Sequence, residues 1–381
     1  MKKIFFLILS IIIASCSTDS NEETNDPIII SQQWKEIDAG FSHNIAINID
    51  GTLWSWGKNT IGQLGDGTNV GKNIPTKISV ETNWKIISCA KNYTIALKDD
   101  GTLWAWGENQ NGELGIGSTT FKNTPTKIGV STDWKSISVG NSHTLALKNN
   151  GTLWAWGNNF AGQLGDGTNI SKNTPTQIGT ETNWVLISSG GSHSLAAKSD
   201  GTLWSWGWNN NYELGLSPAT NLNKNIPTKV STISNCQSIS AGVSSSTIVK
   251  SDGTLWSWGS NIYGQLGTGV ISPSYKTTPT KIGTSANWKT ISVGNHVLAT
   301  KTDGTLWAWG NNDMGQLGGS MSSIYNLPLK IGNSTDWKNV TTGLNHSIGI
   351  KNNGELWTWG INSSGELGDG TYVNKSAPNK I

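Results

Sequence analysis

The sequence predicts an all-β protein, a seven-bladed β-propeller of four-stranded antiparallel blades. Glycine contributes 46 of 381 residues and tryptophan 21, whereas charged residues make up only 14%, a composition typical of turn-rich β-proteins. No window shows sustained 3.6-residue periodicity of apolar residues, so helices are not expected. A short motif recurs seven times at intervals of about fifty residues, which is the repeat length of a propeller blade.

The repeat is marked by the tetrapeptide Gly-Thr-Leu-Trp, which becomes Gly-Glu-Leu-Trp in the last copy. The copies begin at Gly51, Gly101, Gly151, Gly201, Gly253, Gly304 and Gly354. Each copy lies among four β-like segments, which in the third unit begin at Trp134, His143, Thr152 and Pro175. We therefore expect a propeller over residues 34–381, with blades starting near 34, 84, 134, 184, 236, 288 and 337.

Turn chemistry and side-chain size support this prediction. An Asp-Gly or Asn-Gly dipeptide, such as Asp50-Gly51, joins the second and third segments of each unit and favours a tight hairpin. These acids therefore have a structural role. In the third segment Trp54 and Trp56 are expected to face one neighbouring blade and Ser55 the other. The small position leaves room for the indoles of the next blade.

The fourth segment carries a proline in every unit, usually followed two residues later by lysine. Both residue types belong on the exposed outer edge of a sheet, where they discourage aggregation. The seventh such segment is complete at Ile381, so each repeat is expected to supply all four strands of its own blade. Pro27-Ile-Ile-Ile imitates this segment, and its pairing as an extra strand at the ring closure stays open.

The first 33 residues read as a leader and a tether. Lys2 and Lys3 precede an apolar run over residues 4–13, which is too short to cross a hydrocarbon core of about 30 Å as a helix. The run predicts a signal peptide over residues 1–15. Ile-Ala-Ser-Cys resembles the lipobox of bacterial lipoproteins, which implies acylation of Cys16. We expect a flexible tether over residues 16–33 and a lipid-anchored location in the bacterial envelope, with the outer-membrane surface as one option.

The charge balance and the residue types exclude several classes of partner and cofactor. Without Lys2 and Lys3 the chain has 25 basic and 25 acidic residues, and none of its basic residues is arginine. Because arginine supplies the planar fork that grips phosphates and base edges, we expect no nucleic-acid partner. We also expect no cofactor, no metal and no catalytic residue, since the five histidines mostly share one repeat position and loops such as Asp66-Gly-Thr-Asn lack the ligands of a calcium site. Cys89 and Cys236 are predicted to be small buried substitutions without a disulfide.

Three motifs resemble the repeats of the regulator of chromosome condensation family. They are His-Thr-Leu-Ala-Leu, Asp-Gly-Thr-Leu-Trp-Ala-Trp-Gly and Asn-x-x-Gly-Gln-Leu-Gly, and the resemblance covers residues 34–381. It implies a seven-bladed propeller but no single function, because members include an exchange factor, a photoreceptor and a secreted β-lactamase inhibitor. The exchange factor's inserted wedge and the photoreceptor's Trp and Arg loop have no counterpart here. The inhibitor, an exported disc that binds a protein through loops of one face, is the nearest analogue.

The fourth unit departs from the repeat at several positions. Trp208 stands where the first three units have Lys58, Glu108 and Asn158, and Tyr212 replaces a glycine. The candidate partner-binding residues all lie near the connection between the third and fourth segments. They are Phe160, Trp208, Tyr212, Ile262, Tyr263, Tyr275, Met314 and Tyr325. These connections emerge on one face, and aromatic residues on a rigid loop face are typical anchors for ligands. Scattered aromatics that merely cover blade tips would give the same pattern.

These observations lead to the hypothesis of a non-catalytic, envelope-anchored binding scaffold that presents one loop face to a protein or glycan partner. One alternative is an envelope hydrolase or lyase, which would require two or more acids or histidines converging in the central channel. Another is a purely architectural component of adhesion or assembly. The ligand and the oligomeric state stay open.

Overall fold

The computed structural model describes residues 32–381, apart from 217–218, 272–273 and 320–322. The expected signal peptide, Cys16, the tether as far as residue 31 and the Pro27–Ile30 segment lie outside the described residues. Gln32–Ile381 forms one compact unit. Over the described ranges every regular element is a β-strand, and no helix there could cross a membrane.

The described strands form seven antiparallel sheets of four, which confirms the predicted fold class. The first four blades are β1 (Trp34–Ala39), β2 (His43–Asn48), β3 (Leu53–Gly57) and β4 (Lys72–Ser79); β5 (Trp84–Cys89), β6 (Tyr93–Lys98), β7 (Leu103–Gly107) and β8 (Lys122–Ile128); β9 (Trp134–Val139), β10 (His143–Lys148), β11 (Leu153–Gly157) and β12 (Lys172–Ile178); and β13 (Trp184–Ser189), β14 (His193–Lys198), β15 (Thr202–Gly207) and β16 (Lys224–Ser234). The last three are β17 (Cys236–Ala241), β18 (Ser245–Lys250), β19 (Leu255–Ser260) and β20 (Tyr275–Ile282); β21 (Trp288–Val293), β22 (His296–Lys301), β23 (Leu306–Asn311) and β24 (Ile324–Ile331); and β25 (Trp337–Thr342), β26 (His346–Lys351), β27 (Leu356–Gly360) and β28 (Lys375–Lys380).

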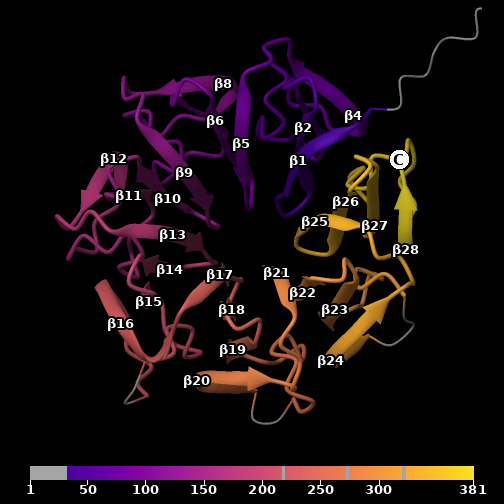
Figure 1. Ribbon diagram of the computed structural model, residues 1–381. Helices are drawn as coiled ribbons and strands as arrows, with labels where there is room; N and C mark the ends of the chain where they lie inside the picture. The colour runs from indigo at the N-terminus through magenta and orange to yellow at the C-terminus, as the bar shows by residue number, and fades with distance from the viewer. Residues whose placement is uncertain (1–31, 217–218, 272–273, 320–322) are drawn as a thin grey trace, which may run out of the picture. The chain divides into compact units, whose positions relative to one another are not determined.

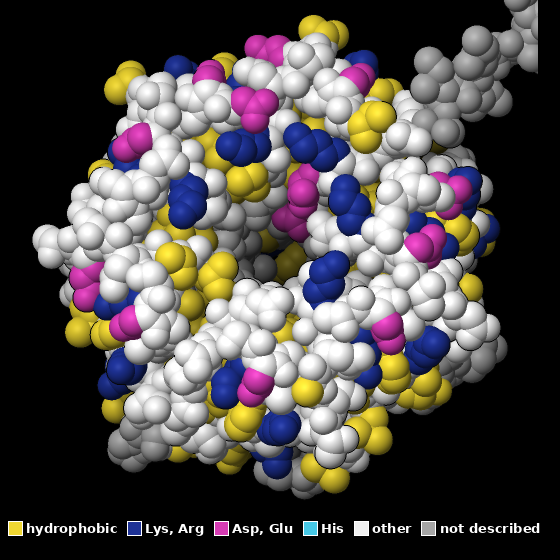
Figure 2. Space-filling model, in the orientation of Figure 1, with side chains coloured by type: hydrophobic (Ala, Val, Ile, Leu, Met, Phe, Trp, Pro, Cys, Tyr) yellow, Lys and Arg dark blue, Asp and Glu magenta, His cyan; other side chains and the backbone are white. Residues whose placement is uncertain are grey.

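The blades stand in a ring, as Figure 1 shows, and the space-filling view of Figure 2 shows a hollow at its centre. In each sheet the strands follow chain order, and the first strand of every blade contacts the first strands of both neighbours, including β25 with β1. The fourth strand is last in each sheet, and its proline and lysine lie on the exposed outer side as predicted. Each described blade consists of four consecutive strands, so the junction between β1–β4 and β25–β28 is closed by side-chain and loop contacts.

The hairpin between the second and third strands is organised by its own side chains. Asp50 Oδ1 accepts hydrogen bonds from the amide of Thr52 at 2.9 Å and from its hydroxyl at 2.6 Å. The Thr52 hydroxyl in turn accepts from the indole N–H of Trp54 at 2.9 Å. Gly51 has a φ of 80°, and a Cβ there would lie 1.9 Å from the Thr82 carbonyl oxygen. The hairpin acid is therefore structural, as the sequence predicted.

One apolar cluster fills each interface between blades. At the second interface Leu103 and Ala105 pack with Trp134 and Trp156 of the next blade. The inner indole of every third strand is fully buried and donates a hydrogen bond to a loop carbonyl of the preceding blade. These bonds are Trp56 to Glu366, Trp106 to Gln63, Trp156 to Glu113, Trp206 to Gln163, Trp258 to Glu213, Trp309 to Gln265 and Trp359 to Gln316, at 2.7 to 3.0 Å. The predicted packing of indole against a small side chain is confirmed.

Replacing one of these indoles tests the interface directly. Trp156→Phe removes the donor to the Glu113 carbonyl and leaves a cavity, so we expect the free energy of unfolding to fall by about 2–4 kcal/mol. Trp208→Phe makes the same chemical change at a side chain that is 39% exposed, and it should cost less than about 0.5 kcal/mol. Urea unfolding measures both. Equal losses in the two variants would contradict the interface role of Trp156.

Candidate functional site

The alternation of strand direction gives the propeller two different faces. The loop face carries the connections between strands one and two and between strands three and four of each blade. The hairpin face carries the hairpins between strands two and three and the connections from strand four to the next blade. All eight aromatic or apolar residues singled out from the sequence lie on or beside the three-to-four connections, at the loop face.

The eight side chains differ in how far they are exposed to solvent. Phe160 is 75% exposed and Ile262 is 51% exposed, and the two occupy the same loop position of blades three and five. Trp208, Tyr275 and Met314 are each 39% exposed. Tyr212, Tyr263 and Tyr325 are half-buried. Tyr325 packs against the apolar clusters at both sides of the sixth blade, so its ring contributes to packing rather than to an open surface.

Tyr212 is the most unusual of the eight residues. Its φ is 63°, in the left-handed region that disfavours side chains. The corresponding glycines, Gly62, Gly112, Gly162, Gly264, Gly315 and Gly365, also have positive φ. Tyr212 stacks on Tyr275 of the next blade, with ring centroids 4.9 Å apart and 30° between the planes. The structure therefore brings Tyr212 and Tyr275 together, and strained backbone at such a place favours a functional role.

Phe160 lies at a second feature of the loop face. Together with Ile170 it lines a shallow groove whose other wall includes Gln110 and Asn111 of the preceding blade. The groove has a volume of about 560 Å³. Ring contacts do not join Phe160 to Trp208 or Tyr263 within the described part of the chain. The predicted residues thus form at least two separate features rather than one continuous aromatic patch.

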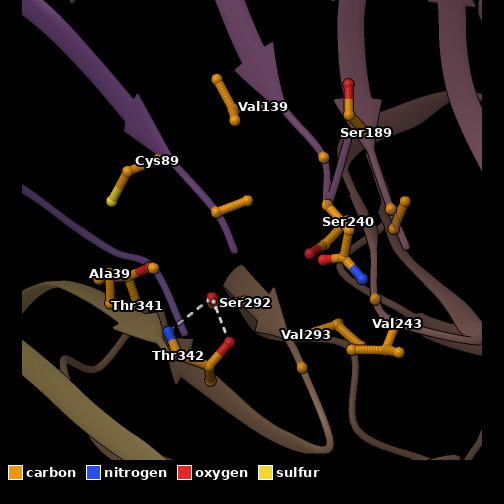
Figure 3. A pocket seen from close by; sticks show the side chains of 18 of the residues that line it. Ala39, Cys89, Val139, Ser189, Ser240, Val243, Ser292, Val293, Thr341 and Thr342 are labelled. Carbon is orange, nitrogen blue, oxygen red and sulfur yellow. Dashed lines mark hydrogen bonds between the residues drawn. The ribbon is translucent and has the colours of Figure 1, made fainter. Parts of the chain in front are cut away.

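The central channel is lined by the ends of the seven inner strands and has a cavity of about 210 Å³ (Figure 3). Its wall carries hydroxyl side chains at one repeat position, namely Ser88, Ser138, Ser188, Ser240, Ser292 and Thr341. Several of them accept hydrogen bonds from the backbone of the next blade. Ser138 Oγ accepts from the Ser189 amide at 2.9 Å, and Ser292 Oγ accepts from the Thr342 amide at 3.0 Å. The ring of hydroxyls thus links neighbouring blades at the channel wall.

Blade one replaces this hydroxyl with a carboxylate. Asp38 accepts hydrogen bonds from the Cys89 amide of blade two at 2.8 Å and from the Thr341 hydroxyl of blade seven at 2.9 Å. Glu36, two residues earlier on β1, accepts from the Asn339 side-chain amide at 3.2 Å. Burial raises the pKa of Asp38 to about 6, and burial together with the nearby Asp38 raises the pKa of Glu36 to about 7.

This carboxylate pair was not predicted from the sequence. Its signal was present but weak, because Asp38 is the one acid at a repeat position that otherwise holds serine or threonine. Reading that signal required the ring geometry, which turns the side chain toward blades two and seven at once. Asp38 lines the channel cavity, Glu36 lies two residues earlier on the same strand, and Asp38 is also a link between three blades.

The histidines hold the ring together, as their shared repeat position predicted. The Nε2 atom of each lies within hydrogen-bond distance of a side-chain oxygen of the next blade, the pairs being His43 with Thr94, His143 with Ser194, His193 with Ser246, His296 with Ser347 and His346 with Asn44. Burial lowers the pKa of the first four to about 3 and that of His346 to about 4. They are neutral structural groups at physiological pH.

The metal-ligand residue types and the two cysteines of the described ranges form neither a metal site nor a disulfide there. No group of three or more His, Cys, Asp or Glu residues there could hold a metal ion. Asp66 Oδ1 accepts from the amide and hydroxyl of Thr68, which is turn geometry. Cys89 and Cys236 are both free, and Cys89 is buried as predicted. Cys236 is only half-buried, so the prediction that it is buried was wrong. The other blades begin with tryptophan at this position, and the smaller cysteine side chain leaves the site partly open.

These features define a repeat-built, seven-bladed β-propeller. Residues 129–381 match the family model of the RCC1-like domain, and residues 50–97 and 100–147 match the model of the regulator of chromosome condensation (RCC1) repeat. The chain therefore belongs to the RCC1-like family.

Known proteins resemble the chain in part of their sequence or in their fold. The X-linked retinitis pigmentosa GTPase regulator homolog of Caenorhabditis elegans is 38% identical over 85 residues, which are 22% of this chain and 6% of that protein. The chain spans only 6 to 14% of the length of the curated relatives that it matches. Prp20p of Saccharomyces cerevisiae shares the fold with a TM-score of 0.78 and 22% identity, over 92% of this chain and 87% of that chain. Human WBSCR16 does so with a TM-score of 0.75 and 22% identity, over 86% and 93%.

The buried histidines predict sensitivity to acid. Their folded pKa values lie below the unfolded value of about 6.5, so between about pH 6.5 and pH 4 the unfolded chain binds protons that the folded chain excludes. The free energy of unfolding should fall with pH by about 1.4 kcal/mol per pH unit for each histidine. Glu36 and Asp38 act in the opposite direction, since their raised pKa values stabilise the folded state as pH falls from about 7. Five histidines outweigh two carboxylates.

Urea unfolding at several pH values measures this dependence. In His193→Gln the slope of stability against pH should decrease by about 1.4 kcal/mol per pH unit, because one buried titrating group is lost. A wild-type stability that does not change between about pH 7 and pH 5 would contradict the role assigned to the histidines.

The Asp38 carboxylate is expected to stabilise the ring. Asp38→Asn keeps the size of the side chain but replaces one accepting oxygen with an amide, so the contact with Cys89 or Thr341 is lost. We expect a loss of about 1–3 kcal/mol in the free energy of unfolding. Asp303→Asn is the matched control, because Asn150 already occupies the same hairpin position in blade three. Its melting temperature should equal that of the wild type; an equal drop in both variants would argue against the bridging role.

Proposed function

We propose that the chain is a non-catalytic binding scaffold, anchored to the bacterial envelope, that presents its loop face to a protein or glycan partner. The observation that carries the proposal is the departure of blades four and five from the repeat. Tyr212 keeps a left-handed backbone conformation that six other blades reserve for glycine, and its ring stacks on the partly exposed Tyr275. Side-chain packing within a blade does not require this arrangement.

The exposed rings give such a face its binding chemistry. Phe160, Trp208 and Tyr275 are 75%, 39% and 39% exposed, and they stand on loops held by a rigid ring of sheets. Large aromatic side chains lose little conformational entropy on binding and dominate interface energetics. The family supports a binding role, since Prp20p, which shares the fold, was characterised for binding to Gsp1p and histones.

Envelope anchoring rests on the leader alone. Residues 1–15 have the composition of a signal peptide, and Cys16 ends a lipobox-like tetrapeptide. A lipid anchor followed by a polar tether would hold the propeller near a membrane surface while leaving its faces free for partners. Mass spectrometry of the mature chain tests this part of the proposal, and it would fail if Cys16 carried no acyl group.

A hydrolase or lyase with a site in the channel is the second candidate, favoured by Glu36 and Asp38. Their raised pKa values, about 7 and about 6, would allow proton transfer near neutral pH. The binding proposal is preferred because Asp38 is already occupied by donors from blades two and seven. A hydrolytic activity of the native protein on envelope material that is lost in Glu36→Gln, without a change in melting temperature, would favour the enzyme instead.

Partner capture tests the loop face. The double variant Trp208→Ala, Tyr212→Gly removes both rings, and glycine at 212 is the residue that the corresponding positions of other blades carry. We expect at least a tenfold loss of binding to envelope proteins or arrayed glycans, since each aromatic anchor contributes about 1 kcal/mol or more. Tyr372→Ala removes a ring that is 60% exposed on blade seven and serves as the control. Unchanged capture by the double variant would refute this face.

A further inference from the structure

Lysine recurs at the second residue of the inner strands. Lys35, Lys85, Lys135, Lys289 and Lys338 occupy this position on β1, β5, β9, β21 and β25, and all five are exposed. We call these residues the basic arc. They belong to five consecutive blades, from the sixth through the seventh and first to the third. Val185 and Gln237 occupy the position in the remaining two blades.

The basic arc surrounds one mouth of the central channel. Inner strands begin at the hairpin face, so their second residues lie at the rim on that side. Figure 2 shows lysine side chains around the central opening, with acidic side chains just inside it. The loop-face aromatics lie at the opposite ends of the strands, so the basic arc is a separate surface.

The lysines of the basic arc have no ion-pair partners among the described residues, whereas neighbouring lysines do. Lys98 lies 2.6 Å from Glu81 and stacks between two indoles, with its Nζ 4.6 Å from the Trp84 centroid and 4.1 Å from the Trp104 centroid. Lys198 repeats the arrangement with Glu181. Glu81 and Glu181 are thus already paired with second-strand lysines. The basic arc places five lysines around the rim, with Glu36 of β1 as the acid whose charge acts on Lys35 and Lys338, and such an excess of positive charge attracts anions.

The surrounding side chains favour one class of anion. The chain has no arginine, so the bidentate contacts that grip nucleic-acid phosphates are missing. The tryptophans that begin the inner strands are buried, Trp34 at 3% and Trp134 at 5% exposure, so these rings are not available for stacking sugars or bases. Separate ammonium groups around a ring fit carboxylates that are distributed along a flexible polypeptide.

We propose that the basic arc is a docking site for an acidic, extended segment of a partner protein. This site is distinct from the loop face and does not depend on its aromatic residues. Charge complementarity steers the segment to the channel mouth, where its Asp and Glu side chains pair with the lysines. The chain would therefore hold partners on both faces.

The charge of Glu36 is expected to weaken the binding of an acidic segment to the basic arc. Glu36 lies on β1 next to Lys35 and the Lys338 of β25, and it also faces Asp38 and Asn339. Because its carboxylate repels an acidic ligand, Glu36→Gln should tighten binding about three-fold at about pH 8 and leave it nearly unchanged at about pH 6. Equal affinity of the variant and the wild type at about pH 8 would remove Glu36 from the site.

A labelled peptide of about ten glutamates provides the probe, and fluorescence anisotropy with the full chain measures its affinity. Lys35→Glu with Lys338→Glu should weaken binding at least about ten-fold, whereas Lys127→Glu with Lys330→Glu, on outer strands, should change it less than about two-fold. Wild-type binding should also weaken steeply with added salt. Equal losses in the two pairs, or no loss in the first, would overturn the proposal.

Three further measurements keep the result unambiguous. If the first pair lowers the melting temperature, Lys85→Gln with Lys135→Gln removes charge without reversing it and should weaken binding about three-fold. Displacement of the peptide by hyaluronan oligosaccharides or single-stranded DNA at lower concentrations than unlabelled peptide would overturn the choice of ligand class. Trp208→Ala with Tyr212→Gly should bind the peptide normally, so failure of the loop-face proposal and failure of this one are separable.

Discussion

A buried indole holds each blade to the blade before it. The inner tryptophan of every third strand has no solvent exposure, and its N–H donates to a loop carbonyl of the preceding blade, as Trp156 does to Glu113 at 2.8 Å. An unpaired indole N–H at such depth would cost stability, so each interface is fixed in one geometry. The acceptor loop must also come close, and a Cβ at Gly115 would lie 2.7 Å from the Trp156 Nε1 atom. The glycine-rich loops and the tryptophans therefore depend on each other.

The repeated indole contact lies at the blade interfaces, away from the two faces where partners would bind. Because the interfaces carry the stability, the two faces can change without loss of the ring. The loop face departs from the repeat at Tyr212 and Trp208, and the hairpin face carries an arc of lysines that is interrupted at blades four and five. The departures from symmetry thus fall on surfaces and on the channel, where a partner can reach them.

Most of the framework was predictable from the sequence because its determinants are local. Asp-Gly hairpins, the alternation around Trp56 and the edge prolines act within a few residues of each other, and a seven-fold repeat makes each signal visible several times. Contacts that occur once and join distant repeats were not predictable. The stacking of Tyr212 on Tyr275, the burial of Tyr325 and the bridge from Asp38 to Cys89 and Thr341 all depend on which blades become neighbours in the closed ring.

The ring is closed between blades seven and one by the same kind of contacts that join the other blades. Hydrogen exchange followed by mass spectrometry tests it at the junction of β1 and β26, where Trp34, Ile37 and Ile348 pack in one cluster. Amides of β1 and β26 should be protected as strongly as those of β13 and β10, which form the equivalent junction between blades three and four, to within about ten-fold. Exchange at the junction that is faster by several orders of magnitude, with the other interfaces protected, would show an open arrangement and contradict the account.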